Sequence, residues 1–243
     1  MKINWDIIKF LVVTSLIVFL FGFSKQRNKL RKVHKITLEF KDENRMFITS
    51  DSVNKLLIQK NDTVTNIGKE TLDLNEMENR LLESPMIKKA EVYVTIDGVL
   101  GANIEQRNPI ARIVGTPDFY LDEDGKKMPL SVVHSERVPI ITGVSEKYFQ
   151  EVTELIKKIN KDDFMKEYVV GMEVASEGDI YLIIRKNSFK ILFGKTTDIE
   201  NKFQKFKAFY KLTKKDSLLD SYNLVNLKFS NQVVATKRID NGE

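Results

Sequence analysis

The longest apolar run in the chain lies close to its start and predicts a membrane-spanning helix. Residues 10–23 are uncharged and apolar, and an extension back to Ile3 reaches the ~20 residues that cross a bilayer. A cleaved signal peptide has a similar apolar core, but no small-residue cleavage site follows this run, which favours an uncleaved anchor. Four aromatic residues mark the predicted anchor: Trp5, Phe10, Phe19 and Phe23.

Residues 83–113 predict the end of a helix followed by a hairpin. Pro85 stops the helical pattern before the hairpin. Asp97 and Gly98 have the turn chemistry that joins two antiparallel strands, and Pro109 limits how far the return strand runs inside a sheet. Apolar residues alternate with polar ones on both sides of the turn, at Ala90, Val92, Val94, Ile96, Leu100, Ala102 and Ile104.

The segment before this hairpin predicts one strand and two helices. Residues 35–40 are a strand candidate, and residues 49–57 begin with cap residues and continue with apolar side chains at helical spacing. Asp73 and Glu76 stand three apart before a second helical pattern. The predicted order is therefore strand, helix, helix, strand, strand, which is the order of a POTRA module.

The second half of the chain predicts a mixed β domain with two helices. A hairpin is expected around Asp124 and Gly125, and Ser145 is expected to cap the first helix, whose apolar stripe is Tyr148, Val152, Leu155, Ile156 and Ile159. Strands are predicted at 168–174, 180–185 and 189–193.

The second of these helices is predicted to begin after Asp198. Its apolar face carries Ile199, Phe203, Phe206 and Tyr210. Its lysines are interpreted as a solvated face: Lys202, Lys205, Lys207 and Lys211.

The last two strands are predicted in residues 222–237. Val225, Leu227 and Phe229 are expected to point to one side of the first strand, and Leu224, Asn226 and Lys228 to the other. Ser230 and Asn231 form a tight turn between the two strands. The final strand is expected at or near a sheet edge, where unpaired backbone groups can accept a strand from another chain.

Composition excludes several kinds of site. The 243 residues, 42% hydrophobic and 30% charged, predict a globular protein without cysteine, so disulfides, zinc–thiolate centres and thiol nucleophiles are excluded. Neither His34 nor His134 fits a catalytic triad, and no glycine-rich phosphate loop is present. An acidic group at Asp122, Glu123 and Asp124 fails the calcium-loop pattern, because Ser131 stands where the closing glutamate belongs. We predict no catalytic residue, no metal, no cofactor and no small-molecule substrate.

The net charge of +5 includes one basic run directly after the apolar segment. A run beside a membrane segment is typical of a membrane flank, and no nucleic-acid partner is predicted. The positive-inside rule alone would leave the body of the protein in the cytoplasm. The run consists of Lys25, Arg27, Lys29, Arg31, Lys32 and Lys35.

Four sequence segments follow the apolar segment in a fixed order, and together they resemble the bacterial cell-division family FtsQ (DivIB), in particular its members from Bacteroidetes. They are FITSDSV, LLESPMIKKAEVYVTIDGVLGANIEQRNPIARI, FYLDEDGKKMPLS and RVPIITG. The resemblance implies an α+β protein with a cytoplasmic tip and anchor (1–24), a basic juxtamembrane segment (25–35), a POTRA-like domain (36–110) and a C-terminal β domain (111–243).

The resemblance also implies a function. FtsQ-like proteins keep their N-terminus in the cytoplasm and their folded part outside the inner membrane, at the division septum. There they act as non-enzymatic scaffolds that bind FtsB and FtsL and recruit or regulate the septal peptidoglycan synthase. Two alternatives remain: a POTRA-containing envelope assembly or transport factor that chaperones outer-membrane polypeptides, and a secreted binding module released by signal cleavage.

In this family, FtsB docks on the C-terminal region by adding a strand. Lysine and phenylalanine stand here where relatives often carry arginine and tyrosine, which keeps charge and aromaticity but loses a bidentate donor and a hydroxyl. The alternative is that the last two strands only complete a sheet. The matching positions are Lys228, Phe229, Gln232, Val233, Val234 and Ala235.

Overall fold

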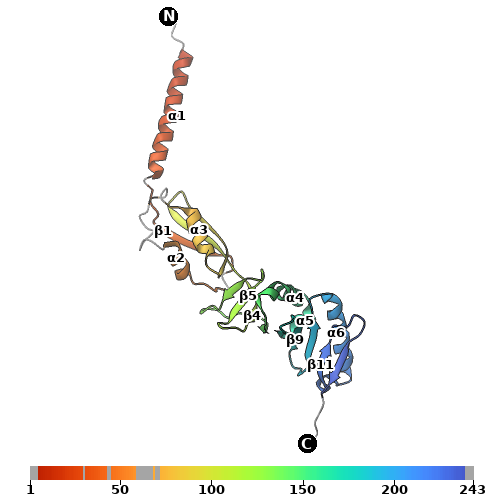
Figure 1. Cartoon of the computed structure of the whole chain (residues 1–243). Helices are drawn as coiled ribbons and strands as arrows, with labels where there is room; N and C mark the ends of the chain where they lie inside the picture. Colours follow the sequence, from red (N-terminus) through yellow and green to blue (C-terminus); the bar gives the residue numbers. More distant parts are fainter. Residues whose placement is uncertain (1–4, 30, 43–44, 59–67, 69–71, 239–243) are drawn as a thin grey trace. The chain divides into compact units, whose positions relative to one another are not determined.

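The computed structural model describes residues 5–29, 31–42, 45–58, 68 and 72–238 (Figure 1). The chain divides into an N-terminal unit, Met1–Gln106, and a C-terminal unit, Arg107–Glu243. This division falls close to the predicted boundary between 110 and 111, and the predicted domain limits themselves stay a prediction. The α+β class with one N-terminal apolar helix is confirmed.

The first helix, α1 (Trp5–Lys29), is the one described helix long and apolar enough to cross a membrane, over Ile8–Arg27. Its apolar side chains are exposed, including Trp5, Phe10, Phe19 and Phe23, which were predicted as the anchor. The hydroxyl of Thr14 donates to the carbonyl of Phe10 and is thus satisfied within the helix, as a polar group in lipid requires. The predicted start at Ile3 lies outside the described residues.

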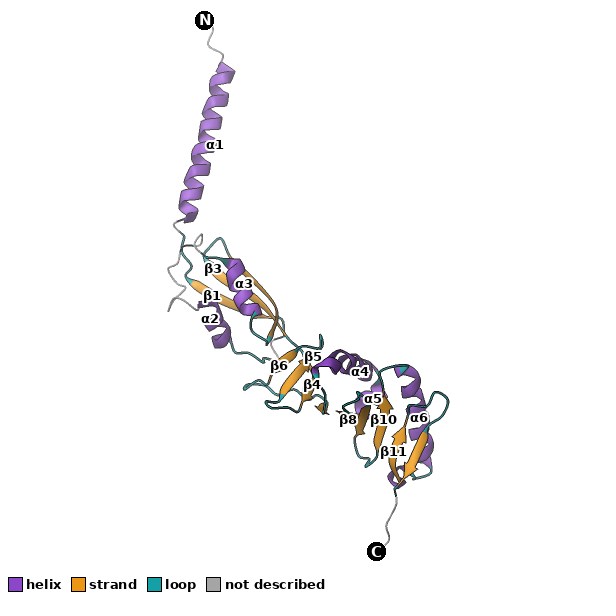
Figure 2. Cartoon of the chain, in the orientation of Figure 1, coloured by secondary structure: helices purple, strands orange, loops and turns teal. Residues whose placement is uncertain are grey.

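The rest of the N-terminal unit has the predicted POTRA order. Its elements are β1 (Lys35–Phe40), α2 (Ser50–Ile58), α3 (Leu74–Leu82), β2 (Ile87–Val94) and β3 (Val99–Gln106). The strands form a sheet in the order β1-β3-β2, with β1 parallel and β2 antiparallel to β3 (Figure 2). Both predicted caps are formed, because Thr49 accepts from the amide of Ser52 and Asp73 from that of Glu76.

The apolar residues that alternate along the hairpin of β2 and β3 pack in the core as predicted, except beside the turn. Leu100, Ala102 and Ile104 of β3 are buried in the core of this unit together with Val92 of β2. Ile96 was predicted to continue the alternation, but β2 ends at Val94 and Ile96 is 73% exposed beside the turn. The turn therefore begins two residues earlier than the apolar pattern indicated.

The C-terminal unit forms a nine-stranded sheet in the order β12-β11-β10-β9-β8-β7-β4-β5-β6. Its strands are β4 (Pro109–Ile113), β5 (Phe119–Asp122), β6 (Lys127–Pro129), β7 (Ile140–Thr142), β8 (Val169–Val174), β9 (Ile180–Ile184), β10 (Lys190–Gly194), β11 (Tyr222–Asn226) and β12 (Val234–Lys237). Its helices are α4 (Phe149–Lys161), α5 (Asp163–Tyr168) and α6 (Ile199–Lys215), with short 3₁₀ turns η2 (Glu146–Tyr148) and η3 (Leu219–Ser221).

Helices α4 and α6 pack on the sheet as their patterns predicted, but the start of α4 differs. Ser145 was predicted to cap the first helix; instead it precedes the 3₁₀ turn η2 and its hydroxyl makes no capping hydrogen bond. The predicted apolar stripe is buried from Val152 onward, whereas Tyr148 is only partly buried. All four residues of the apolar stripe predicted for α6 are buried.

The lysines of α6 do not form a single solvated face. Lys202 is 6% exposed, donates to the carbonyl of Lys195 at 2.7 Å and lies 4.6 Å from the centre of the Phe193 ring. Burial lowers the pKa of Lys202, and the nearby charge of Lys205 acts in the same direction. The prediction of a solvated lysine face is correct for Lys211, which is exposed. It is wrong for Lys202, because the ammonium of Lys202 folds back over the end of the sheet.

Asp162 joins three helices of the C-terminal unit. It follows α4, caps α5 through the amide of Met165 at 3.0 Å, and binds Lys207 of α6 at 2.5 Å. Burial alone would raise the pKa of Asp162, but the hydrogen bonds from Lys207 and Met165 outweigh it and hold that pKa below its usual range.

Replacing Asp162 by alanine is therefore expected to destabilise the C-terminal unit by about 1–3 kcal/mol at neutral pH. Because the folded-state pKa of Asp162 is lowered, its contribution is present above the ordinary aspartate range and is lost as the pH falls through the lowered value. Denaturation of both forms between pH 7 and pH 2 measures the difference. A difference that did not shrink in acid would contradict this account.

Candidate functional site

The final strand, β12, lies at one edge of the nine-stranded sheet, as the sequence predicted. It pairs antiparallel with β11, from Tyr222 opposite Lys237 to Asn226 opposite Val234. Its other side pairs with no strand among the residues that the structure describes. A strand with one open side offers backbone donors and acceptors to an added strand.

The segment between the two strands, residues 227–233, is a bend fixed by side chains from elsewhere in the unit. Lys205 of α6 donates to the carbonyl oxygens of Phe229 at 2.8 Å and Ser230 at 3.2 Å. The amide of Leu227 donates to Leu192 at 2.9 Å, which continues the pairing with β10 beyond the end of β11. The bend is thus held by both α6 and the sheet.

Lys228 lies across the end of β10. Its ammonium binds the carboxylate of Asp179 at 2.7 Å, and that hydrogen bond raises the pKa of Lys228. A methyl group on Gly194, which has a φ of 73°, would stand 2.7 Å from the Cγ of Lys228, so this glycine makes room for the lysine stem. Lys195 lies 3.8 Å from the same carboxylate. One carboxylate therefore faces two ammonium groups, and the surface keeps a positive excess.

The six predicted partner-binding residues lie together in this region but differ in exposure. Phe229 is 47% and Val234 38% exposed, so both present apolar area to solvent. Val233 and Ala235 are half-buried and pack against the core of the unit, and Gln232 is exposed. Only part of the predicted set is therefore open to a partner.

Sequence reasoning missed three residues that shape this surface: Lys205, Asp179 and Lys195. Lys205 was placed among the solvated lysines, although its ammonium fixes the bend. No local pattern marks Asp179, since it meets Lys228 across 49 positions of the chain. The only sequence signal for a basic surface was the number of lysines in and just before α6, including Lys195.

The sheet of the N-terminal unit also has open edges, but one of them is partly covered. Glu78 of α3 accepts a hydrogen bond at 2.8 Å from the amide of Val92, which belongs to the edge strand β2. A carboxylate that occupies an edge amide competes with an incoming strand. The edge at β12 has no such cover among the described residues.

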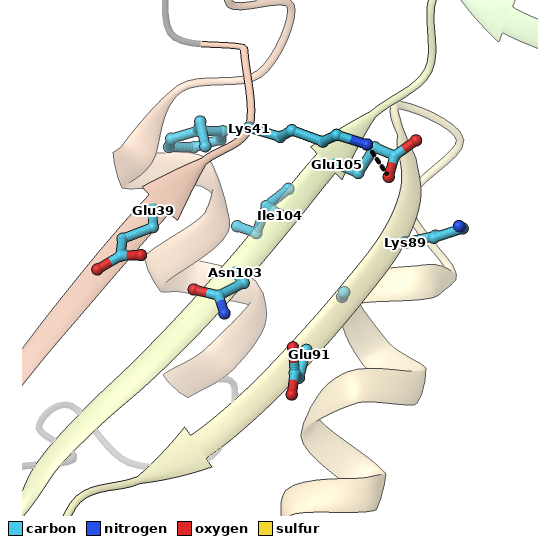
Figure 3. A pocket seen from close by; sticks show the side chains of 9 residues that line it. Glu39, Lys41, Lys89, Glu91, Asn103, Ile104 and Glu105 are labelled. Atoms are coloured by element: carbon cyan, nitrogen blue, oxygen red, sulfur yellow. Dashed lines mark hydrogen bonds and ion pairs between the residues drawn. The ribbon is translucent and has the colours of Figure 1, made fainter.

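A shallow cavity of about 450 Å³ lies on the sheet of the N-terminal unit (Figure 3). Glu39, Asn103 and Glu91 lie at paired positions on its three strands. Lys41 binds Glu105 at 3.1 Å, and this hydrogen bond lowers the pKa of Glu105. Among the described residues no group of three His, Cys, Asp or Glu side chains could hold a metal ion. The lining carries three carboxylates and two ammonium groups, so the cavity is a surface of mixed charge.

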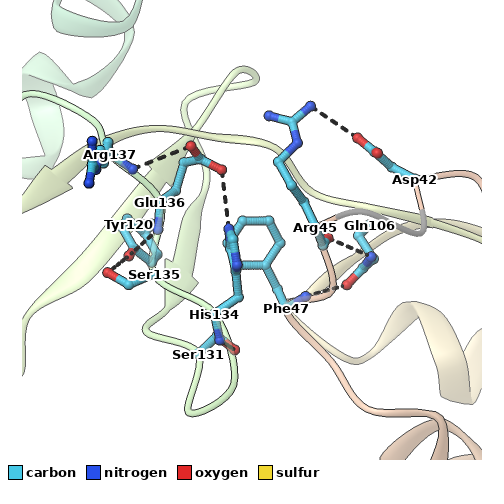
Figure 4. A network of polar contacts seen from close by, with 10 residues as sticks. All are labelled: Asp42, Arg45, Phe47, Gln106, Tyr120, Ser131, His134, Ser135, Glu136 and Arg137. Atoms are coloured by element: carbon cyan, nitrogen blue, oxygen red, sulfur yellow. Dashed lines mark hydrogen bonds and ion pairs between the residues drawn. The ribbon is translucent and has the colours of Figure 1, made fainter.

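Two polar networks fix loops in the two units (Figure 4). In the N-terminal unit the side-chain oxygen of Gln106 accepts from the amides of Phe47 at 2.7 Å and Ile48 at 3.1 Å. In the C-terminal unit the hydroxyl of Tyr120 accepts from the amide of Glu136 at 3.2 Å and lies 3.3 Å from Ser135 Oγ. The contacts of Gln106 anchor the segment before α2, and those of Tyr120 tie the loop before β7 to β5.

Comparisons with known proteins match both units. A family model described as FtsQ/DivIB, C-terminal related, matches residues 108–236, and a model described as a POTRA-like domain matches residues 31–105. No curated protein matches the chain.

Proposed function

We propose that this chain, which belongs to the FtsQ/DivIB family, is a non-enzymatic divisome scaffold that binds FtsB and FtsL outside the inner membrane. The family model covers more than half of the chain, and together with the POTRA-like match it supports a division-related scaffold. The same match over the C-terminal unit favours division over envelope transport.

The observation that carries the proposal is the open edge of β12 beside the fixed bend. FtsB would add a strand along β12, because main-chain hydrogen bonds to an edge strand fix the geometry of a partner without a deep pocket. The exposed side chains of Phe229 and Val234 would supply apolar contact. Lys228 and Lys195 would attract carboxylates of the partner.

Scaffolding would then follow from this contact. A complex with FtsB and FtsL would recruit or regulate the septal peptidoglycan synthase by bringing it to the site of division. In this mechanism the chain contributes a rigid edge and charged anchors, and the chemistry of cell-wall synthesis belongs to the recruited enzyme.

The proposal requires the folded units to lie outside the cytoplasm, with α1 as an uncleaved anchor. A reporter that is active only outside the cytoplasm, fused after Glu243 in the full-length chain, is expected to be active, because a long folded domain can translocate against a local charge bias. The fusion is also expected to remain with the inner membrane at full length.

Activity of a cytoplasmic reporter at the same position would overturn the proposed orientation. Release of a shortened chain into the soluble fraction would instead support the secreted binding module. A matched variant with glutamine at Lys25, Arg27 and Arg31 lowers the basic charge after the apolar segment and is expected to leave the reporter signal unchanged or raise it.

A further inference from the structure

A second pocket lies within the C-terminal unit, with a volume of about 360 Å³. Three cationic side chains line it: Arg137 before β7, Lys166 of α5 and Arg185 after β9. Its other lining residues are Val138, Pro139, Ile159, Asn160, Val169 and Val170. The pocket thus combines an aliphatic wall with three positive groups and one amide.

The cations of this pocket have no carboxylate partner among its lining residues; the nearby carboxylate of Glu136 accepts a hydrogen bond from the backbone amide of Arg137 at 3.3 Å. No carboxylate lines the pocket. Within the described part of the chain, the side chains of Arg137, Lys166 and Arg185 take part in no hydrogen bond or ion pair, whereas many surface lysines of this unit are paired, such as Lys158 with Glu200 and Lys190 with Glu173. Three like charges around one cavity attract an anion.

The backbone at each cationic residue is fixed. The amide of Arg185 donates to Tyr168 at 2.7 Å and that of Lys166 to Asp162 at 2.8 Å. The loop that carries Arg137 is held at the carbonyl of Pro139 by the amide of Arg112, at 2.9 Å, in addition to the contacts of Tyr120. The charged side chains therefore project from a fixed backbone, so binding has to order the side chains but not the backbone.

The pocket is separate from the β12 surface. Val169 pairs with Ile184, so the pocket lies where β8 begins and β9 ends. The 227–233 bend follows the end of β11, beside Leu192 and the beginning of β9. These are opposite ends of strands about five residues long, or roughly 15 Å apart along the strand direction. A ligand in the pocket would leave β12 open.

We propose that this pocket binds an acidic peptide segment, in which one or two carboxylates flank an aliphatic side chain. Guanidinium groups bind carboxylates through paired hydrogen bonds, and the ammonium of Lys166 adds a point charge. The aliphatic side chain would pack on Val138, Pro139 and Ile159. The site is distinct from strand addition at β12 and does not depend on it.

The lining favours a peptide over other anions. A free phosphate group would use the cations but leave the wall of valine, proline and isoleucine without a partner. Nucleic acid is disfavoured, because no aromatic side chain lines the pocket for base stacking. An acidic residue beside an aliphatic one satisfies both halves of the pocket.

The test uses the full chain in detergent micelles with labelled isoleucine methyl groups, and it follows the signal of Ile159. The probes are acetyl-Glu-Ile-Glu-amide, its neutral analogue acetyl-Gln-Ile-Gln-amide, and glycerol 3-phosphate as a phosphate of lipid-headgroup type. The acidic peptide is expected to shift the Ile159 signal saturably, and to bind at least about tenfold more tightly than either other probe.

Exchange of Arg137 and Arg185 for glutamine is expected to weaken peptide binding at least about tenfold. The matched control exchanges two exposed lysines of α6, Lys211 and Lys215, for glutamine and changes the net charge equally. Equal affinity in both variants, tighter binding of glycerol 3-phosphate, or no shift with the peptide would each overturn the proposal. Unchanged signals of the buried Ile141 and Ile156 report an intact fold.

Discussion

Replacing Phe229 by alanine is expected to weaken the proposed binding of FtsB by at least about tenfold, because aromatic anchors carry a large share of interface energy. Phe229 is 47% exposed in a bend that Lys205 and Leu227 fix through their backbone partners. Since the ring is not part of the core, the fold is expected to remain. Equilibrium binding of the full chain to purified FtsB, with circular dichroism as a fold control, measures both.

A glutamate at Val234 tests the same surface from the edge strand itself. This side chain is 38% exposed on β12, and a carboxylate there would lose apolar contact and repel an acidic partner. The control is Val132→Glu, since Val132 is fully exposed in the same unit and lies outside the bend. If Val234→Glu and Val132→Glu bound FtsB equally well, the partner site would have to lie elsewhere.

Local patterns predicted the elements whose neighbours in the fold are also neighbours in sequence. The hairpin of β2 and β3 and the caps of α2 and α3 each depend on a few adjacent residues, and all of them formed. The apolar stripe of α6 was likewise sufficient, because its period of 3.6 residues already selects the buried face.

Several short elements that depend on distant partners were not predicted. The strand β7 (Ile140–Thr142) has three residues, too few to show an alternation, and it exists because β4 and β8 pair with it on both sides. The strand β4 begins at Pro109, which was interpreted only as a limit on the strand before it; a proline can occupy the first position of a strand. The short helix α5 depends on Asp162, whose capping role the sequence analysis did not identify.

In the candidate site, too, the position of the strand was predicted and the contacts between distant residues were not. The strand pattern predicted that the final strand lies at or near a sheet edge, and the topology agrees that β12 is an edge strand. The side chains that hold the bend were missed, because Lys205 and Asp179 reach it across 24 and 49 positions of the chain. Charge along a helix indicates exposure on average, but a lysine stem can reach back over the protein surface.

The ion pair between Arg107 and Asp122 gives the largest expected effect on stability. The two groups lie 2.7 Å apart, with their side chains 13% and 1% exposed. Asp122 also accepts hydrogen bonds from the amides of Asp124 at 2.9 Å and Lys126 at 2.7 Å. The acidic group that the sequence analysis excluded as a calcium loop is thus organised by an internal cation, and Asp122 shapes the turn between β5 and β6.

Asp122→Ala is expected to destabilise the C-terminal unit by about 3–5 kcal/mol, because it removes the nearer counter-charge of the largely buried Arg107, whose other carboxylate, on Asp124, lies 4.0 Å away, and leaves two turn amides without an acceptor. Hydrogen exchange of peptides from β4 and β5 in the full chain measures the loss locally. Glu167→Ala removes an exposed carboxylate of the same unit and is expected to change the stability by less than about 0.5 kcal/mol.

A second variant separates the lost counter-charge from the lost turn acceptor. Combining Asp122→Ala with Arg107→Met removes the cation that has lost its nearer counter-charge and keeps an apolar stem, so part of the stability is expected to return. The remaining deficit would belong to the amides of Asp124 and Lys126, which still lack an acceptor. If the double variant were as unstable as Asp122→Ala alone, the turn amides rather than the ion pair would account for the loss.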